Sequence, residues 1–255
     1  MRLVRVLARR ILGVRRIPTY YLPWIARAQL ECVLVLSNIE ARFRPGSSPG
    51  PFRLSARQHD ERGRVVGEYA VELADHLAAA EVPLTRGTEG CGIVTVDVAQ
   101  IQSDLYVALC GAGSYTVTHG RHEFVERYPA WTRLVMAALG RLLALMGRTI
   151  PAFARNQYVY SGADHRSHLL LMNLSNVTNR IRVDLQSRAF EWTPRLLALP
   201  PMGAHLLRLP AATRGETAGL HVGRLHAAGN AWFNLYVVGA GPRDLAGPLS
   251  LMHVK

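Results

Sequence analysis

The sequence predicts a mostly β protein, made of two antiparallel β-sandwiches in tandem, joined by an α-helix and preceded by a basic amphipathic helix. Two halves of the chain, about residues 32–123 and 158–253, share an order of landmarks. Short runs of alternating apolar and polar residues recur between turn residues, and the segment between the halves has helical periodicity. We therefore expect four segments: a basic N-terminal arm at 1–28, a first β-sandwich at 29–125, a linker helix within 126–154 and a second β-sandwich at 155–255.

The shared landmarks predict an internal duplication. An apolar run ends in Asn38 in the first half and in Asn173 in the second, an offset of 135 residues. A Leu-Tyr-Val run leads to Gly-Ala-Gly in both halves, and the last strand-like run ends in His119 and His253, an offset of 134 residues. Nearly constant offsets are typical of a repeated unit.

Residues 1–17 have the pattern of a basic amphipathic helix that ends before Pro18. A helix of this kind, followed by aromatic residues, is typical of an element that lies on a membrane surface. The alternatives are that the arm docks on the protein's own surface or is disordered. No uninterrupted apolar core of a secretory signal is present, so we expect a cytoplasmic protein, peripheral at the inner face of the membrane. The expected membrane contacts are Arg2, Arg5, Arg9, Arg10, Arg15, Arg16 and Trp24.

The body of each half has the pattern of strands. Residues 93–98, 115–119, 179–185 and 233–238 alternate between the two faces of a sheet or are rich in β-branched side chains. Gly, Pro and Asn mark the turns between them. Parallel βαβ units would require helices between the strands, which the pattern lacks, so antiparallel sandwiches are favoured. Residues 71–80 also fit a short helix.

The second predicted helix spans about residues 130–146. Pro129 precedes it and Gly147 ends it. Its apolar stripe consists of Leu134, Val135, Ala138, Leu142 and Leu145. A membrane-spanning helix needs about 20 apolar residues, and Arg141 interrupts this run, so we do not expect it to cross a membrane. Two roles stay open: a linker packed across both sandwiches, or a helix lying on a membrane beside the N-terminal arm.

Charge is concentrated at the N-terminus. The chain has a formal net charge of +12, and residues 1–27 hold seven arginines and no acidic residue. The remainder is mildly basic, which argues against a nucleic-acid-binding body and leaves nucleic-acid binding by the arm as a minor alternative. Cys32, Cys91 and Cys110 have no metal-binding or disulfide spacing, so we expect free thiols, with a Cys91–Cys110 bridge as the alternative.

Two His-x-x-His segments flank the linker. Two histidines and a carboxylate would suit a divalent metal such as zinc or iron. Residues three apart on a strand point to opposite faces, so each pair converges only on a turn or a helix. The competing interpretation is that these are polar residues at the rims of loops. No other cofactor is expected. The candidate metal ligands are His119, His122, Asp164, His165 and His168.

Arginines and tyrosines also gather where the two halves are expected to meet. Guanidinium groups suit carboxylate, sulfate or phosphate, and aromatic faces suit sugars, so this seam is a candidate site for an acidic glycan or a lipid headgroup. The candidate ligand-binding residues are Arg121, Arg127, Tyr128, Arg155, Tyr158 and Arg166.

The sequence has no nucleophile elbow, phosphate loop or Ser-His-Asp order, so it does not predict an enzyme. We expect a non-catalytic binding or scaffolding protein, peripheral to a membrane, which binds an acidic glycan, a lipid headgroup or a protein partner at the seam. The alternative is a metal-dependent enzyme with a His/Asp site at the same seam. The oligomeric state is left open.

Overall fold

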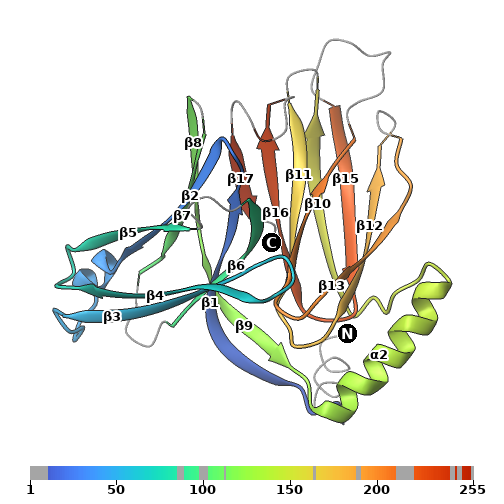
Figure 1. Ribbon diagram of the computed structural model, residues 1–255, viewed down its shortest axis with the longest axis horizontal. Helices are drawn as coiled ribbons and strands as arrows, with labels where there is room; N and C mark the ends of the chain where they lie inside the picture. Colours follow the sequence, from blue (N-terminus) through green and yellow to red (C-terminus); the bar gives the residue numbers. More distant parts are fainter. Residues whose placement is uncertain are drawn as a thin grey trace.

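The computed structural model describes residues 11–84, 89–97, 103–111, 113–162, 165–187, 191–210, 221–241, 245 and 249–253 (Figure 1). Within these residues the chain forms 17 β-strands in four antiparallel sheets and one α-helix, α2 (Ala130–Leu145). The mostly β prediction is confirmed, and the helix lies where its periodicity places it.

The first half contains two sheets. One has the order β4-β3-β6-β1-β9 and the other β5-β2-β7-β8. A single 3-10 turn, η1 (Ile39–Phe43), follows β2. The strands are β1 (Arg15–Ala26), β2 (Leu30–Ser37), β3 (Phe52–His59), β4 (Val65–Leu73), β5 (Ala79–Leu84), β6 (Gly90–Val96), β7 (Tyr106–Gly111), β8 (Ser114–His119) and β9 (Arg121–Arg127).

The second half also contains two sheets, with the orders β10-β15-β12-β13 and β14-β11-β16-β17. Its strands are β10 (Phe153–Ser161), β11 (Arg166–Asn173), β12 (Asn179–Gln186), β13 (Arg195–Leu199), β14 (Ala204–Arg208), β15 (His221–Gly229), β16 (Phe233–Ala240) and β17 (Ser250–His253). Matched in chain order, β10 to β17 occupy the same sheet positions as β1 to β8, and β9 is an additional edge strand of the first half. Residues 71–80 form the end of β4 and the start of β5 with a turn between them, so the short helix is wrong.

The predicted arm at 1–28 is too long, because residues 15–26 form β1. This strand pairs with both β6 and β9 and is buried from Tyr20 to Ala26. Trp24 is 2% exposed, and its Nε1 donates a hydrogen bond of 2.8 Å to the carbonyl oxygen of His59. Trp24 is therefore a core residue and not a membrane contact. An uninterrupted apolar run is typical of a strand covered on both faces. Arg2, Arg5, Arg9 and Arg10 lie outside the described residues.

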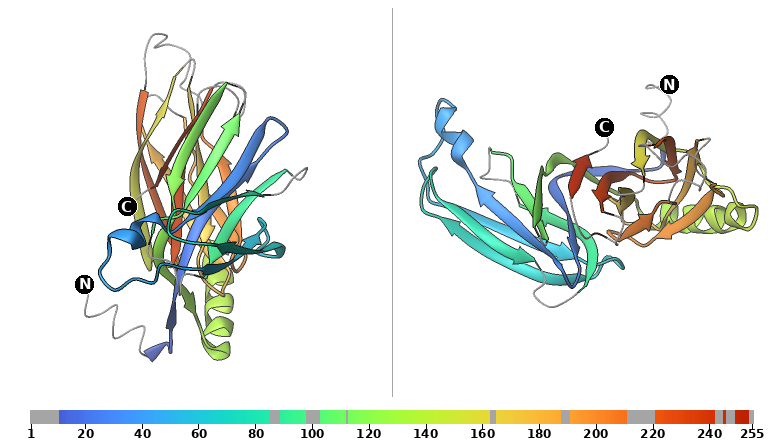
Figure 2. Two further views of the ribbon diagram at one scale, coloured as in Figure 1. Left: turned by 90° about the vertical axis from the view of Figure 1, so that its left-hand side faces the viewer. Right: turned by 90° about the horizontal axis from the view of Figure 1, so that it is seen from above.

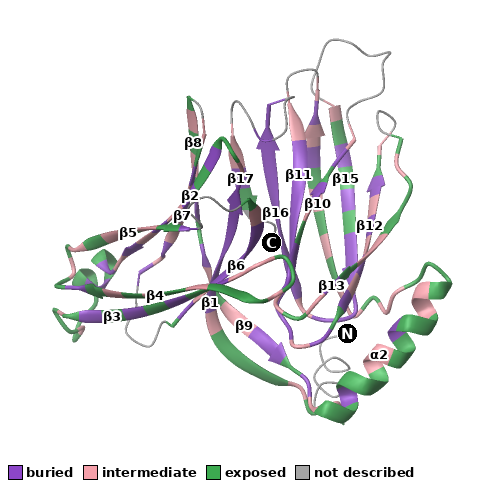
Figure 3. Ribbon diagram, in the orientation of Figure 1, coloured by how far each residue is buried: buried purple, intermediate pink, exposed green. Residues whose placement is uncertain are grey.

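The two halves share a core. The sheet that contains β11 and β16 is buried on both faces, and Figure 3 shows β16 buried along its whole length. Leu169 and Leu171 face the other sheet of the second half, whereas Leu170 and Met172 pack in the core of the first half. Alternate residues of one strand thus belong to two cores. The predicted seam is a packed apolar contact. From above, the first-half sheets spread away from it and α2 lies at the opposite end (Figure 2).

Candidate functional site

A buried polar cluster crosses the seam. The side-chain amide of Asn234 on β16 donates a hydrogen bond to the hydroxyl of Tyr21 on β1, and that hydroxyl donates to Glu123 on β9 at 2.9 Å. Glu123 also forms an ion pair with Arg121 at 3.0 Å. Burial, and then the charge of Glu123, raises the pKa of Tyr21, so this hydroxyl stays protonated and keeps its role as a donor.

A stack of cations and aromatic rings lies beside this cluster. The guanidinium of Arg155 on β10 lies 4.7 Å from the ring centroid of Trp232, whose ring is 4.7 Å from that of Phe124. The guanidinium of Arg16 in turn lies over the ring of Phe124, with its Cζ 3.7 Å from the ring centroid. Burial lowers the pKa of Arg155, and its Nε has no hydrogen-bond partner among the described residues. These contacts fasten β9 and β10 together, as expected for cation–π pairs that are partly shielded from water.

The structure brings together two of the six predicted ligand residues, Arg121 and Arg155, which lie around Glu123. Tyr128 is buried, and its hydroxyl donates a 2.7 Å hydrogen bond to Glu126. The other three lie apart: Arg127 is exposed at the end of β9, Tyr158 is exposed on β10, and Arg166 begins β11 at the wall of a cleft. The six therefore do not line one pocket.

The four histidines of the predicted metal site are spread over several strands. His119 is exposed on β8, whereas His122 on β9 packs edge-on against the ring of Tyr20, 4.4 Å between centroids. His168 is buried within β11, and His165 precedes that strand. Asp164 lies outside the described residues. No group of three or more His, Cys, Asp or Glu side chains that could hold a metal occurs in the part of the chain that the structure describes. The metal site stays a prediction.

A cavity of about 770 Å³ lies between the β3–β4 turn, Trp24 and Cys91. The thiol of Cys91 donates to the carboxylate of Glu61 at 3.4 Å. Burial, and then the charge of Glu61, holds the pKa of Cys91 well above its usual range. A buried, protonated thiol is a poor nucleophile, so the chemistry of this cavity does not point to a cysteine enzyme.

A second cleft, of about 560 Å³, opens beside β14, and we call it the arginine cleft. It lies where β13 and β14, edge strands of the two second-half sheets, diverge from the turn at residues 200–203. The residues that line it are Arg166, Glu191, Trp192, Thr193, Arg195, His205, Leu206, Leu207, Arg208, Leu209 and Pro210. Sequence reasoning singled out Arg166 alone among them. The sequence held one usable signal for the cleft. Arg195 begins and Arg208 ends two short apolar runs that are joined by a Pro-Pro-Met-Gly turn, so a hairpin-like turn would bring the two arginines to the same end.

The helix α2 contacts the protein through a narrow face only. Thr132 and Gly140 are its buried residues, and the hydroxyl of Thr132 donates a 2.8 Å hydrogen bond to the carbonyl oxygen of Leu12. Met136 packs beside Val177, and the guanidinium of Arg180 lies against Gly140. These positions recur every four residues and therefore follow one line along the helix.

The side of α2 that faces away from Thr132, Met136 and Gly140 is apolar and exposed. Figure 3 shows most of the helix as exposed. Leu134 is 72% exposed and Leu145 87% exposed. At about 100° per residue, the exposed apolar side chains span roughly 140° of the helix circumference. They are Trp131, Leu134, Val135, Leu139, Leu142, Leu145 and Met146, and we call them the apolar face of α2. The predicted stripe is thus real, but it does not pack across the two sandwiches.

No protein-family model, curated protein or solved structure matches this chain. Among the helices that the structure describes, none has the length and apolar character needed to cross a membrane. Any functional assignment therefore rests on the chemistry of these surfaces.

Proposed function

We propose that the protein is a non-catalytic, peripheral membrane-binding protein, and that α2 lies on an anionic lipid surface with its apolar face in the interface. The observation that carries this proposal is the exposure of seven large apolar side chains on one side of a helix. A contiguous exposed apolar surface of this kind marks an interaction site. A helix with an apolar face and flanking arginines is suited to lie in the plane of a bilayer interface.

The charge around α2 favours an anionic surface. Arg133, Arg141 and Arg148 are exposed on or just after the helix. Residues 127–163 contain no acidic residue, and neither do residues 1–30. The two stretches meet, because Gly13 contacts Pro129 and Leu12 accepts the hydrogen bond from Thr132. Basic residues beside an interfacial helix attract the anionic lipids that predominate at the cytoplasmic leaflet.

The energy of such docking is considerable. Full burial of a leucine side chain is worth about 1.5–3 kcal/mol, so a few side chains that enter the acyl boundary suffice for reversible binding. Residues 1–10 add Arg2, Arg5, Arg9 and Arg10, and in the sequence they precede Leu12, which accepts the hydrogen bond from Thr132 at the start of α2. This role for the arm rests on the sequence pattern.

We also infer that the two halves derive from a duplicated β-sandwich. The support is the matched strand order of the sheets together with the repeated landmarks. Among the described elements, β9 and α2 have no counterpart in the second half. The elements proposed to bind the membrane are therefore those outside the repeat.

Vesicle co-sedimentation tests the proposal. The wild-type protein should bind vesicles of phosphatidylcholine mixed with phosphatidylglycerol more strongly than vesicles of phosphatidylcholine alone. Replacing Leu142 and Leu145 together by Glu should weaken binding by about tenfold or more, because a carboxylate is costly to bury at the acyl boundary and is repelled by anionic lipids. The matched control is Leu77→Glu, since Leu77 is 64% exposed on a turn of the first half and Leu142 is 58% exposed.

Deletion of residues 1–10 should weaken binding further at low salt, because it removes four arginines. The deletion stops before Arg15, since β1 begins there. The proposal is contradicted if the wild-type protein does not bind anionic vesicles, or if the double variant binds them as strongly as the wild type does. If sedimentation velocity instead shows a dimer that the double variant disrupts, and no vesicle binding occurs, the apolar face serves a second copy of the chain.

A further inference from the structure

We propose that the arginine cleft binds a soluble acidic saccharide, with its guanidinium groups holding carboxylate, sulfate or phosphate substituents of the sugar. The cleft is separate from the apolar face of α2, and only the choice of a soluble ligand over a lipid headgroup rests on the proposed membrane contact.

Three strands supply the cations of the cleft. Arg166 begins β11, Arg195 begins β13, and Arg208 ends β14. The register pairs His168 with Arg208, so Arg208 lies beside the start of β11, on the same sheet as Arg166. Because β13 belongs to the facing sheet, the cleft has guanidinium groups from both sheets of the second half. Planar guanidinium groups bind carboxylate, sulfate and phosphate through paired hydrogen bonds.

Among the residues that the structure describes, the three arginines of the cleft have no carboxylate partner, whereas some other arginines do. Three exposed arginines of the first half are paired across neighbouring strands or a turn: Arg53 with Glu72, Arg57 with Glu68, and Arg64 with Asp60. Within the described residues, no ion pair involves Arg166, Arg195 or Arg208. Of the described lining residues only Glu191 is acidic, and it is exposed. The cleft therefore has an excess of positive charge.

Partial burial of Arg166 increases the free energy gained when an anionic ligand binds in the cleft. Arg166 is only partly exposed and forms no ion pair with a described residue, and a guanidinium withdrawn from water without a counter-ion is costly. An anion bound beside it offsets that cost. His205 adds a hydrogen-bonding group, since partial burial lowers its pKa and keeps the imidazole neutral at pH 7.

Part of the remaining lining is apolar. Leu206, Leu207 and Leu209 line the cleft, and Trp192 stands at its other side with the guanidinium of Arg195 5.1 Å from its ring centroid. A volume of about 560 Å³ falls in the range of small-molecule sites, roughly 300–1,000 Å³. Apolar walls that contact the C–H faces of a sugar ring, together with guanidinium groups for its acidic substituents, fit a charged saccharide better than a bare inorganic ion.

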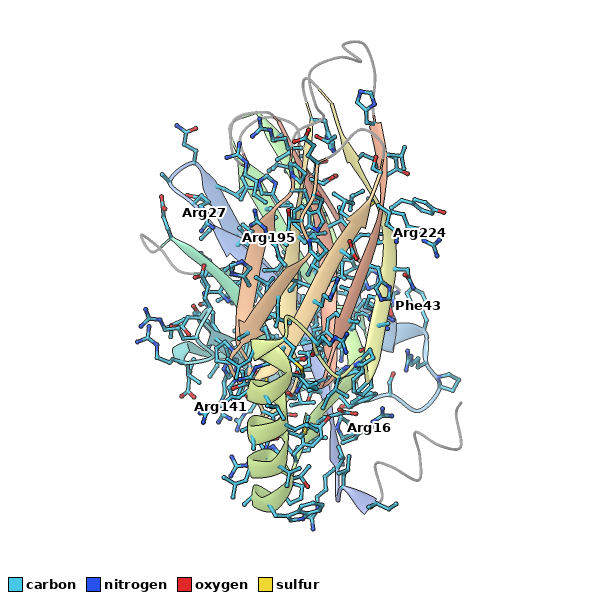
Figure 4. The ribbon with its side chains drawn as sticks, turned by 90° about the vertical axis from the view of Figure 1, so that its right-hand side faces the viewer. Arg16, Arg27, Phe43, Arg141, Arg195 and Arg224 are labelled. Atoms are coloured by element: carbon cyan, nitrogen blue, oxygen red, sulfur yellow. The ribbon has the colours of Figure 1, made fainter. Side chains whose placement is uncertain are left out.

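The position of the cleft separates its ligand from a bilayer. Arg195 lies beside the strands, well away from Arg141 on α2 (Figure 4). A membrane in contact with the apolar face would lie at the other end of the β-structure. The acidic groups therefore come from a soluble ligand, and a lipid headgroup is the alternative that the experiment separates.

Isothermal titration calorimetry with three acidic saccharides tests the assignment: trigalacturonate for carboxylate, sucrose octasulfate for sulfate and glucose 6-phosphate for phosphate. Maltotriose, sucrose and glucose are the neutral counterparts. We expect at least one acidic saccharide to bind at millimolar concentration or below, and its neutral counterpart to bind at least about tenfold more weakly.

The variant Arg195→Gln/Arg208→Gln should weaken that binding by about tenfold or more and leave the unfolding temperature close to that of wild type, because both side chains are exposed. Arg224→Gln is the matched control: Arg224 is an exposed strand arginine on β15, outside the lining of the cleft (Figure 4). The assignment is overturned if none of the three acidic saccharides binds, or if the double variant binds as the control does. Binding only to vesicles that carry phosphoinositides, lost in the double variant, overturns the soluble saccharide in favour of a lipid headgroup.

Discussion

Asn234 and Tyr21 lie 213 residues apart in the chain and share a buried hydrogen bond in which the amide of Asn234 donates to the tyrosine hydroxyl. The same hydroxyl donates to Glu123. One side chain of β1 thus connects the second half of the protein to the edge strand β9. The halves are held together by this polar link within an apolar core.

Replacing Tyr21 by Phe should destabilise the folded protein by about 1–3 kcal/mol, because the amide of Asn234 and the carboxylate of Glu123 each lose a buried partner. Urea unfolding monitored by circular dichroism measures this change. Tyr115→Phe is the control, since Tyr115 is 76% exposed on β8. Equal stability of the two variants would contradict a structural role for the link.

The turn between β3 and β4 should be sensitive to the addition of one methyl group. Gly63 has a φ of +76°, and a Cβ at this position would overlap the carbonyl oxygen of Pro201 in the second half. Gly63→Ala should therefore destabilise the protein more than Gly46→Ala. Gly46 has the same φ of +76° but open space around it, so it reports the backbone strain alone. The difference between the two unfolding free energies measures the contact between the halves, and a difference of zero would rule that contact out.

The three cysteines should differ in reactivity. Cys110 is exposed, whereas Cys32 and Cys91 are buried, and burial raises the pKa of Cys32 to about 12. In native protein a maleimide should label Cys110 alone, and in urea it should label all three, as counted by mass spectrometry. Cys110→Ser should abolish the native labelling. A mass lower by two hydrogens under non-reducing conditions would show a disulfide and contradict the three free thiols of the structure, and peptide mapping would show whether it joins Cys91 to Cys110.

Stability should fall as the pH drops below about 6.5, in part through His59. Burial, with the charge of Arg57 contributing, lowers the pKa of His59 in the folded protein. The unfolded chain therefore binds a proton at a higher pH than the folded chain does, which favours unfolding as the solution is acidified from the unfolded pKa toward the folded one. His59→Gln should reduce the pH dependence of the unfolding free energy between pH 7 and 5. His119→Gln, at an exposed position, controls for loss of an imidazole, and identical slopes in His59→Gln and wild type would contradict the prediction.

Strand pattern and helix position could be predicted because they depend on local periodicity. Residues 179–185 alternate as expected and lie in β12, and the helix predicted at 130–146 is observed at Ala130–Leu145. β1 was missed because its apolar run, which follows six arginines, has the composition of a membrane-surface segment. The arginine cleft was missed apart from Arg166, since its three arginines lie on three strands and the shared turn of β13 and β14 links only Arg195 and Arg208 in the sequence.

The sequence by itself determined the mostly β class, the positions of several strands and the apolar stripe of α2. Tertiary structure alone decided what each apolar surface faces. Leu170 and Leu171 are both buried because sheets lie on either side of β11. Leu142 and Leu145 are just as apolar, but they face outward because α2 packs on the protein through another side, formed by Thr132, Met136 and Gly140. Periodicity shows which side chains share a face, but the partner that covers that face comes from a distant part of the chain.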